Sequence, residues 1–105
     1  MNEKQFHASA DQLMLAIEEA IDDSGADLDY ENSAGMLTIT VEANGSQLIL
    51  SRQPAIAELW LAIRAGGLHF TCSDGVWVST VDGQPLLDRL NQALREQGGE
   101  TLPLG

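Results

Sequence analysis

The stretch MLTITVEANGSQLILSR, residues 36–52, contains two strand patterns separated by one turn signal. Its apolar residues fall at every second position on both arms: Leu37, Ile39, Val41, Leu48 and Leu50. Alternation with period two is typical of a strand with one buried face. Between the arms, Asn44-Gly45 favours a tight turn because both residues tolerate positive φ. The stretch therefore predicts a β-hairpin that buries one face.

Comparable strand patterns lie on both sides of this hairpin. They cover residues 28–32, 57–64, 68–72 and 76–80, and glycine or proline separates them from one another. Leucine, alanine and glutamate in 57–64 also favour helix, but the alternation and the short length of this run favour a strand. Within it, Leu59, Leu61 and Ile63 share one face, which leaves Trp60 pointing outward. The pattern around Trp77 leaves open whether it faces the core or solvent.

Two amphipathic helices enclose the strands. The first is predicted from about Glu3 to Asp23, with Ser24-Gly25 as its stop and an apolar stripe of Phe6, Ala10, Leu13, Ile17 and Ile21. The second begins near Pro85, ends at Gly98-Gly99 and buries Leu86, Leu87, Leu90, Ala93 and Leu94. This order indicates an α+β sandwich in one domain over residues 1–105, with five or six antiparallel strands and both helices on one sheet face. The tail, residues 101–105, either packs across the helices or frays.

Acidic residues gather where the first helix ends and the first strand begins. Residues 11–31 contain no Lys or Arg and eight acids: Asp11, Glu18, Glu19, Asp22, Asp23, Asp27, Asp29 and Glu31. Their spacing predicts stripes on the helix that continue along one face of the strand, which together form an acidic ridge. Like charges one turn apart cost about 0.2–0.5 kcal/mol per pair, and acids at a helix C-terminus oppose its dipole. We interpret the ridge as a functional surface. The alternative is a solvated face that discourages aggregation at a sheet edge.

Metal binding is the chemistry that suits such a ridge. Carboxylates are hard oxygen ligands for Fe, Mn, Mg or Ca, but without a buried cage they keep water and bind weakly. His7 lies one turn before Asp11 and adds an imidazole. The predicted metal ligands are therefore His7, Asp11, Glu18, Glu19, Asp22, Asp23, Asp27, Asp29 and Glu31.

Composition excludes several other classes of function. The net charge of −11 opposes binding to nucleic acid and to anionic membranes, and it favours cations or basic protein surfaces. The single cysteine, Cys72, excludes an internal disulfide and suits a reducing compartment. No apolar run approaches a membrane span of about 18 residues, and Met1-Asn2-Glu3-Lys4 does not resemble a signal peptide, so a cytoplasmic protein is expected. The sequence contains no nucleophile motif that would indicate an enzyme.

These residues together resemble the bacterial frataxin family. The resemblance lies in Phe6-His7 with Asp11-Gln12-Leu13, Ile17-Glu18-Glu19 with Asp22-Asp23, Leu37-Thr38-Ile39-Thr40, Asn44-Gly45-Ser46, Arg52-Gln53, Leu59-Trp60-Leu61-Ala62, and Gly66-Gly67 with His69-Phe70. It extends over nearly the whole chain in order. It implies a helix–sheet–helix sandwich, in agreement with the periodicity.

The resemblance also implies a function. Members of this family bind iron and tune iron–sulfur cluster assembly by docking on a complex of cysteine desulfurase and scaffold. By position, the ridge acids would carry iron weakly at the surface, while Glu18, Glu19, Asp22, Asp23 and Trp60 would contact the partner. The resemblance implies a non-enzymatic regulator that is a monomer without iron. Two alternatives stay open, namely an acidic adaptor or inhibitor with incidental metal binding, and oxidation of Fe(II) on the ridge.

Overall fold

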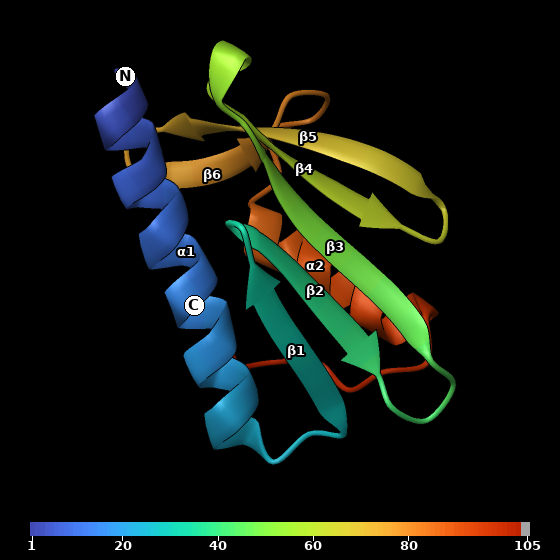
Figure 1. The fold of residues 1–105 in the computed structure, drawn as a ribbon. Coiled ribbons are helices and arrows are strands. Elements are labelled where there is room, and N and C mark those ends of the chain that lie inside the picture. Colours follow the sequence, from blue (N-terminus) through green and yellow to red (C-terminus); the bar gives the residue numbers. More distant parts are fainter. Residues whose placement is uncertain (104–105) are drawn as a thin grey trace.

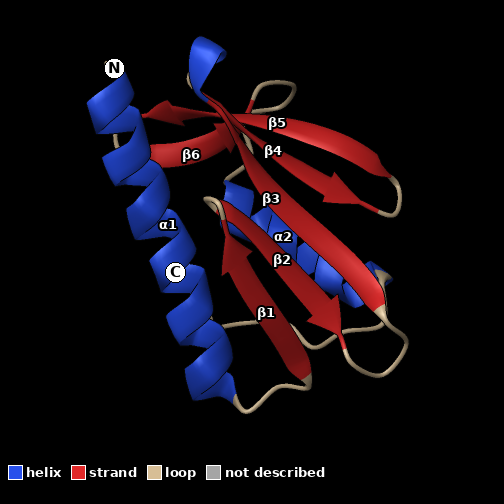
Figure 2. Ribbon diagram, in the orientation of Figure 1, coloured by secondary structure: helices blue, strands red, loops and turns tan. Residues whose placement is uncertain are grey.

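Six antiparallel strands form one sheet whose spatial order follows the sequence, β1-β2-β3-β4-β5-β6, in the computed structural model, which describes residues 1–103. The elements are α1 (Glu3–Ser24), β1 (Leu28–Ser33), β2 (Met36–Val41), β3 (Ser46–Gln53), β4 (Glu58–Ile63), β5 (Gly66–Ser73), β6 (Val76–Ser79) and α2 (Leu86–Glu96). A 3₁₀ turn over Pro54–Ile56 joins β3 to β4. Figure 1 follows the chain through these elements, and Figure 2 separates the helices from the sheet.

Both helices pack on the same face of the sheet and leave the other face open. The core between these layers consists of Phe6, Ala10, Met14, Ile17, Ile21, Leu28, Leu37, Ile39, Val41, Leu48, Leu50, Leu59, Leu61, Phe70, Trp77, Leu86, Leu90, Ala93, Leu94 and Leu102. The strand residues in this set alternate with open-face residues, as the period-two pattern requires. The predicted α+β sandwich is therefore confirmed.

Helix α1 begins and ends as its sequence indicates. Asn2 and Gln5 form a reciprocal capping box, with Gln5 N donating to Asn2 Oδ1 at 2.8 Å. Gly25 ends the helix with φ 69°, a left-handed conformation that glycine adopts without a Cβ clash. The predicted apolar stripe is wrong at one position, because Met14 is buried in the core and Leu13 is only partly buried. Both lie at the margins of the stripe, and Met14 Sδ accepts a hydrogen bond from Arg52 of β3.

The two tryptophans occupy opposite faces of the sheet. Trp77 pairs in register with Cys72, two residues from the core residue Phe70 on β5, so its side chain points to the helices. It is 5 % exposed, and its Nε1–H donates to Ser9 Oγ at 3.1 Å. Trp60 lies on the open face and is 40 % exposed, as the alternation predicts.

The tail crosses the helical layer as far as it is described. Leu102 is 3 % exposed, and its backbone exchanges two hydrogen bonds with the Asn91 side chain, at 2.7 and 2.9 Å. Leu104 and Gly105 lie outside the described residues. No helix within residues 1–103 has the length and hydropathy that a membrane span needs.

A candidate cation- and partner-binding surface

Hydrogen bonds join the acidic side of α1 to β1. Tyr30 donates its hydroxyl to Asp22 Oδ2 at 2.9 Å, and Asn32 Nδ2 donates to Glu18 Oε2 at 3.0 Å. Because strand side chains alternate, Tyr30 and Asn32 point to α1, while Asp29 and Glu31 point to the open sheet face. The ridge therefore turns a corner, from the surface of a helix onto the open face of the sheet.

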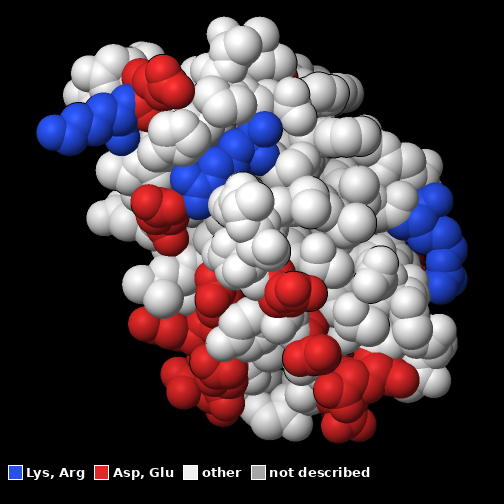
Figure 3. Space-filling view, viewed as in Figure 1, with Lys and Arg blue, Asp and Glu red and all other residues white. Residues whose placement is uncertain are grey.

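Acids from distant parts of the sequence extend the ridge beside Asp27, between α1 and β1. Glu42 N donates to Asp27 O at 3.1 Å, and Asp27 N donates to Glu100 Oε2 at 3.3 Å. Glu42 and Glu100 thus lie beside Asp27, a grouping that local sequence patterns could not predict. Figure 3 shows acidic side chains gathered over the end of α1 and the neighbouring strands, whereas basic side chains are few and lie apart.

The ridge carboxylates beyond Asp11 lack basic partners in the described part of the chain. Within residues 1–103, none of the acids from Glu18 to Glu31 forms an ion pair with Lys, Arg or His. The pKa of Tyr30 responds to these neighbouring carboxylates. The hydrogen bond to Asp22 raises the pKa of Tyr30 above its usual value, and partial burial and the charges of Asp22, Glu18 and Asp29 raise it further.

The ridge carboxylates suit a hard cation, but only as a weak site at the surface. Among residues 1–103, no three His, Cys, Asp or Glu side chains gather closely enough to enclose a metal ion. Glu19, Asp22, Asp23, Asp27, Asp29 and Glu31 are all exposed, and Glu18 is half-buried. Cations would therefore meet carboxylates that are spread along the surface and would keep much of their water.

His7 and Asp11 stand apart from the rest of the ridge because Arg52 holds both. Arg52 is 14 % exposed and reaches from the end of β3 to Asp11 Oδ1 and, at 3.0 Å, to His7 Nδ1. Its Nε also donates to Gly35 O at 3.0 Å. Guanidinium can only donate, so it occupies the Nδ1 lone pair that a metal would need. The arrangement assigns these two predicted ligands a role in fastening α1 to the sheet.

The open sheet face carries a second group of side chains. Trp60 of β4 pairs in register with His69 of β5, and their rings are nearly parallel, with centroids 6.3 Å apart and planes at 16°. His69 Nδ1 lies 3.0 Å from Glu58 Oε1. The indole rests over Gly67, where a Cβ would come within 2.2 Å of Trp60 Nε1. Asp29 and Glu31 share this face at its β1 edge, so the Trp60 group and part of the ridge face the same direction.

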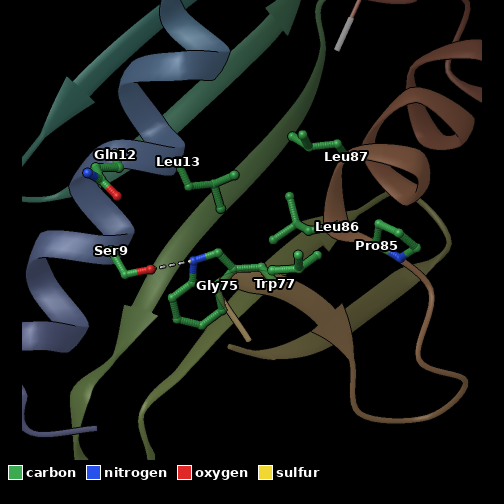
Figure 4. Close-up of a pocket in the computed structure, with 9 residues that line it drawn as sticks. Ser9, Gln12, Leu13, Gly75, Trp77, Pro85, Leu86 and Leu87 are labelled. Atoms are coloured by element: carbon green, nitrogen blue, oxygen red, sulfur yellow. Dashed lines mark hydrogen bonds between the residues drawn. The ribbon is translucent and has the colours of Figure 1, made fainter. Parts of the chain in front are cut away.

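A cavity lies away from both groups, between α1 and the start of α2. It has a volume of about 300 Å³ and is lined by Ser9, Gln12, Leu13, Gly75, Val76, Trp77, Pro85, Leu86 and Leu87. Figure 4 shows α1 on one side, the start of α2 on the other, and Trp77 bonded to Ser9 between them. Its lining is mainly apolar, with Ser9 and Gln12 as its polar side chains.

A known family matches most of the chain. The model of the frataxin-like domain family matches residues 1–100. The chain belongs to the frataxin-like family. The predicted family is therefore confirmed, and the frataxin-like sandwich explains why two patterns far apart in sequence share one face.

Relatives cover almost the whole frataxin-like chain. It is 49 % identical over 102 residues to the iron-sulfur cluster assembly protein CyaY of Pseudomonas paraeruginosa, covering 95 % of this chain and 94 % of that one. It is 43 % identical over 104 residues to the protein of the same name from Stutzerimonas stutzeri, covering 97 % and 94 %. A solved frataxin from Psychromonas ingrahamii superposes with a TM-score of 0.91 at 38 % identity, covering 97 % of this chain and 96 % of that one.

Proposed function

We propose that this frataxin-like protein acts in iron–sulfur cluster assembly as a non-catalytic, iron-binding regulator that docks on a cysteine desulfurase complex. Relatives at 43–49 % identity are named iron-sulfur cluster assembly proteins, which supports the assembly role. The observation that carries the docking role is the common direction of two features. The carboxylates of β1 and the exposed ring of Trp60 lie on one open sheet face.

Iron is the substrate or cargo of this surface rather than a caged cofactor. The ligands proposed for it are the ridge acids Glu18, Glu19, Asp22, Asp23, Asp27, Asp29 and Glu31, with Glu42 and Glu100 beside them. Hard carboxylate oxygens suit ferrous and ferric ions, and their exposure favours loose binding and ready release. A protein that hands on its metal benefits from such weak attachment.

The partner is proposed to present a basic surface. Long-range attraction by the ridge accelerates encounter and is screened within about 8 Å at physiological ionic strength. Trp60 then provides short-range burial, which slows dissociation. The ridge acids at the corner, Glu18, Glu19, Asp22 and Asp23, approach the partner together with Trp60.

Surface plasmon resonance on an immobilised desulfurase tests this proposal. Neutralising Glu19, Asp23 and Glu31 as amides is expected to lower the association rate several-fold at low salt and to flatten its salt dependence. A control with Asp74, Asp82 and Asp88 as amides removes the same number of charges from exposed positions outside the ridge. Equal losses in both variants would show that only net charge matters and would contradict a specific ridge.

Metal binding is tested separately on the same variants. Paramagnetic broadening of NMR signals by Mn(II) is expected to begin between Glu18 and Glu31, and to weaken in the ridge variant but not in the control. Broadening that begins at His69 and Cys72 would contradict the assignment. These two side chains point to opposite faces of β5, so they do not form one metal site.

A further inference from the structure

The proton position on His69 follows from its partner. Its Nδ1 lies 3.0 Å from Glu58 Oε1, and an ionised carboxylate only accepts hydrogen bonds. Nδ1 therefore donates and carries the proton, which leaves Nε2 with a bare lone pair in neutral His69. Within residues 1–103 Nε2 has no hydrogen-bond partner, and the side chain is 49 % exposed. The open face thus presents an imidazole acceptor to solvent.

His7 has the opposite arrangement. Arg52 Nη1, which only donates, lies 3.0 Å from His7 Nδ1, so the proton of neutral His7 is on Nε2, on the side of Glu3. The chain contains two histidines, and their neighbours fix opposite tautomers. His7 therefore serves as an internal control for His69.

Three groups beside each other on the open face all favour a cation. The exposed indole of Trp60 offers an electron-rich ring face, His69 offers the Nε2 lone pair, and Glu58 offers a carboxylate whose side chain is 24 % exposed. The indole lies against Gly67, where any side chain would displace it. A guanidinium is planar, stacks on aromatic rings and donates hydrogen bonds in its plane.

We propose that the cluster of Glu58, Trp60 and His69 is a receptor for an arginine side chain of the protein partner. The arginine would stack on Trp60 and donate to His69 Nε2, with Glu58 supplying the opposing charge. This inference deepens the proposed docking function and depends on it only for the identity of the partner. The overall charge of −11 favours the same basic group.

Protons compete with that arginine for His69 Nε2. A proton taken up at Nε2 would turn this acceptor into a cationic donor. Glu58 is the charged side chain that faces His69 from β4. The open-face neighbours are Gly67 and Thr71 on β5, Val78 and Thr80 on the β6 side, and Ser51 and Gln53 on β3, none of which has a charged side chain. Partner binding is therefore expected to weaken as pH falls.

A first experiment tests the receptor without any macromolecular partner. N-acetyl-arginine methylamide is titrated at constant ionic strength while the imidazole nitrogens and the indole N–H groups are followed by ¹H–¹⁵N NMR. Shifts at Trp60 and His69, absent at Trp77 and His7, are expected, together with a protonated Nδ1 in neutral His69. Equal shifts with N-acetyl-glutamine methylamide, shifts confined to the ridge, or an Nε2–H tautomer of His69 would each overturn the proposal.

A second experiment uses the desulfurase between pH 6 and pH 8. The affinity of the unmodified chain for the desulfurase should decrease as the pH is lowered. His69→Phe should bind about tenfold more weakly than the unmodified chain at pH 8, and its affinity should not change with pH. His7→Gln should keep the pH dependence, and Glu58→Gln, which retains an acceptor for Nδ1, should lose affinity several-fold. A pH dependence that survives in folded His69→Phe would overturn the inference.

The two experiments separate the inference from the proposed function. If the arginine derivative shifts Trp60 and His69 but no variant binds the desulfurase, the receptor stands and the proposed partner is wrong. If the desulfurase binds but the derivative leaves both residues unchanged, the docking function stands and the arginine receptor is wrong.

Discussion

Tyr30 and Asp22 share a hydrogen bond of 2.9 Å that connects the first strand to the last turns of α1. Tyr30 is the only tyrosine in the chain, so the change in ultraviolet absorbance on tyrosine ionisation reports the pKa of this residue alone. Its pKa is raised, first by the bond to Asp22. We expect the pKa to exceed the ordinary value of about 10, and to fall toward it in Asp22→Asn. Asp74→Asn, far along the sequence in the β5–β6 turn, should leave it unchanged.

The same titration reports cation binding. A divalent ion on the ridge adds positive charge near the phenol, so Mg²⁺ or Mn²⁺ should lower the pKa of Tyr30. The raised pKa also links to stability. Because the folded-state pKa lies above the unfolded one, the contribution is fully present below about pH 10 and is lost as pH rises through the folded value. A Tyr30 pKa that stays unchanged at saturating Mn²⁺ would contradict cation binding at the ridge beside Tyr30.

Relieving repulsion on the outer side of α1 should not destabilise the fold. Glu19 and Asp23 are exposed and one turn apart, and within residues 1–103 their side chains accept no hydrogen bond. Glu19→Gln with Asp23→Asn should leave the free energy of unfolding unchanged or raise it by about 0.2–0.5 kcal/mol. Urea denaturation measures the difference. A clear loss of stability would reveal structural partners for these acids.

Arg52 should matter far more to stability than a surface arginine. Its removal leaves Gly35 O, His7 and Asp11 without their donor, and only part of this loss is screened because Asp11 is exposed. Arg52→Ala is expected to lower the free energy of unfolding by about 2 kcal/mol. Exposed Arg64→Ala, the matched control, should change it by less than about 0.5 kcal/mol. Similar values for both would contradict a fastening role.

Gly67 offers a way to disturb Trp60 without mutating it. A methyl group there would lie 2.2 Å from Nε1, so the exposed indole must leave its seat, while Gly67 has no positive φ that would oppose alanine. Gly67→Ala should therefore raise the desulfurase dissociation rate and leave the circular dichroism spectrum unchanged. Trp60→Ala should cost about 2 kcal/mol or more in binding. Normal dissociation in Gly67→Ala would show that the indole orientation is unimportant.

The tail should act as part of the core. Leu102 is 3 % exposed, so Leu102→Ala is expected to cost about 2 kcal/mol of unfolding free energy, at the low end for a buried leucine because the end of the chain can relax. Leu15→Ala, at a position of α1 that is 55 % exposed, provides a control of the same chemistry with little expected loss. Thermal denaturation compares the two.

Periodicity was enough to predict the elements but not every neighbour. The strand alternation predicts the outward position of Trp60, because register leaves only two faces to choose from. Met14 and Leu13 lie on opposite margins of one helical stripe, so periodicity alone does not decide which of them is buried. The face of Trp77 depends on the register of the last hairpin, which the pattern did not determine.

The surface required three-dimensional information of another kind. Sequence proximity predicts the acids between Glu18 and Glu31, but Glu42 and Glu100 join them only because the chain returns to Asp27 from two directions. His7 looks like a ligand beside Asp11 in sequence. Its contact with Arg52 joins residues 45 positions apart, and no local pattern predicts it.

The sequential order of the strands has a consequence for how the chain acquires its structure. Each strand pairs with the next one along the chain, so every ladder closes over a short turn at small entropic cost. Hairpins can therefore form early and independently, and the sheet can grow by adding strands at either edge. The slow step should be docking of α1 onto the assembled strands, because contacts such as Ser9 with Trp77 join residues 68 positions apart. Substitutions at that contact should slow refolding, whereas those in the β2–β3 turn should chiefly change the initiation of the sheet.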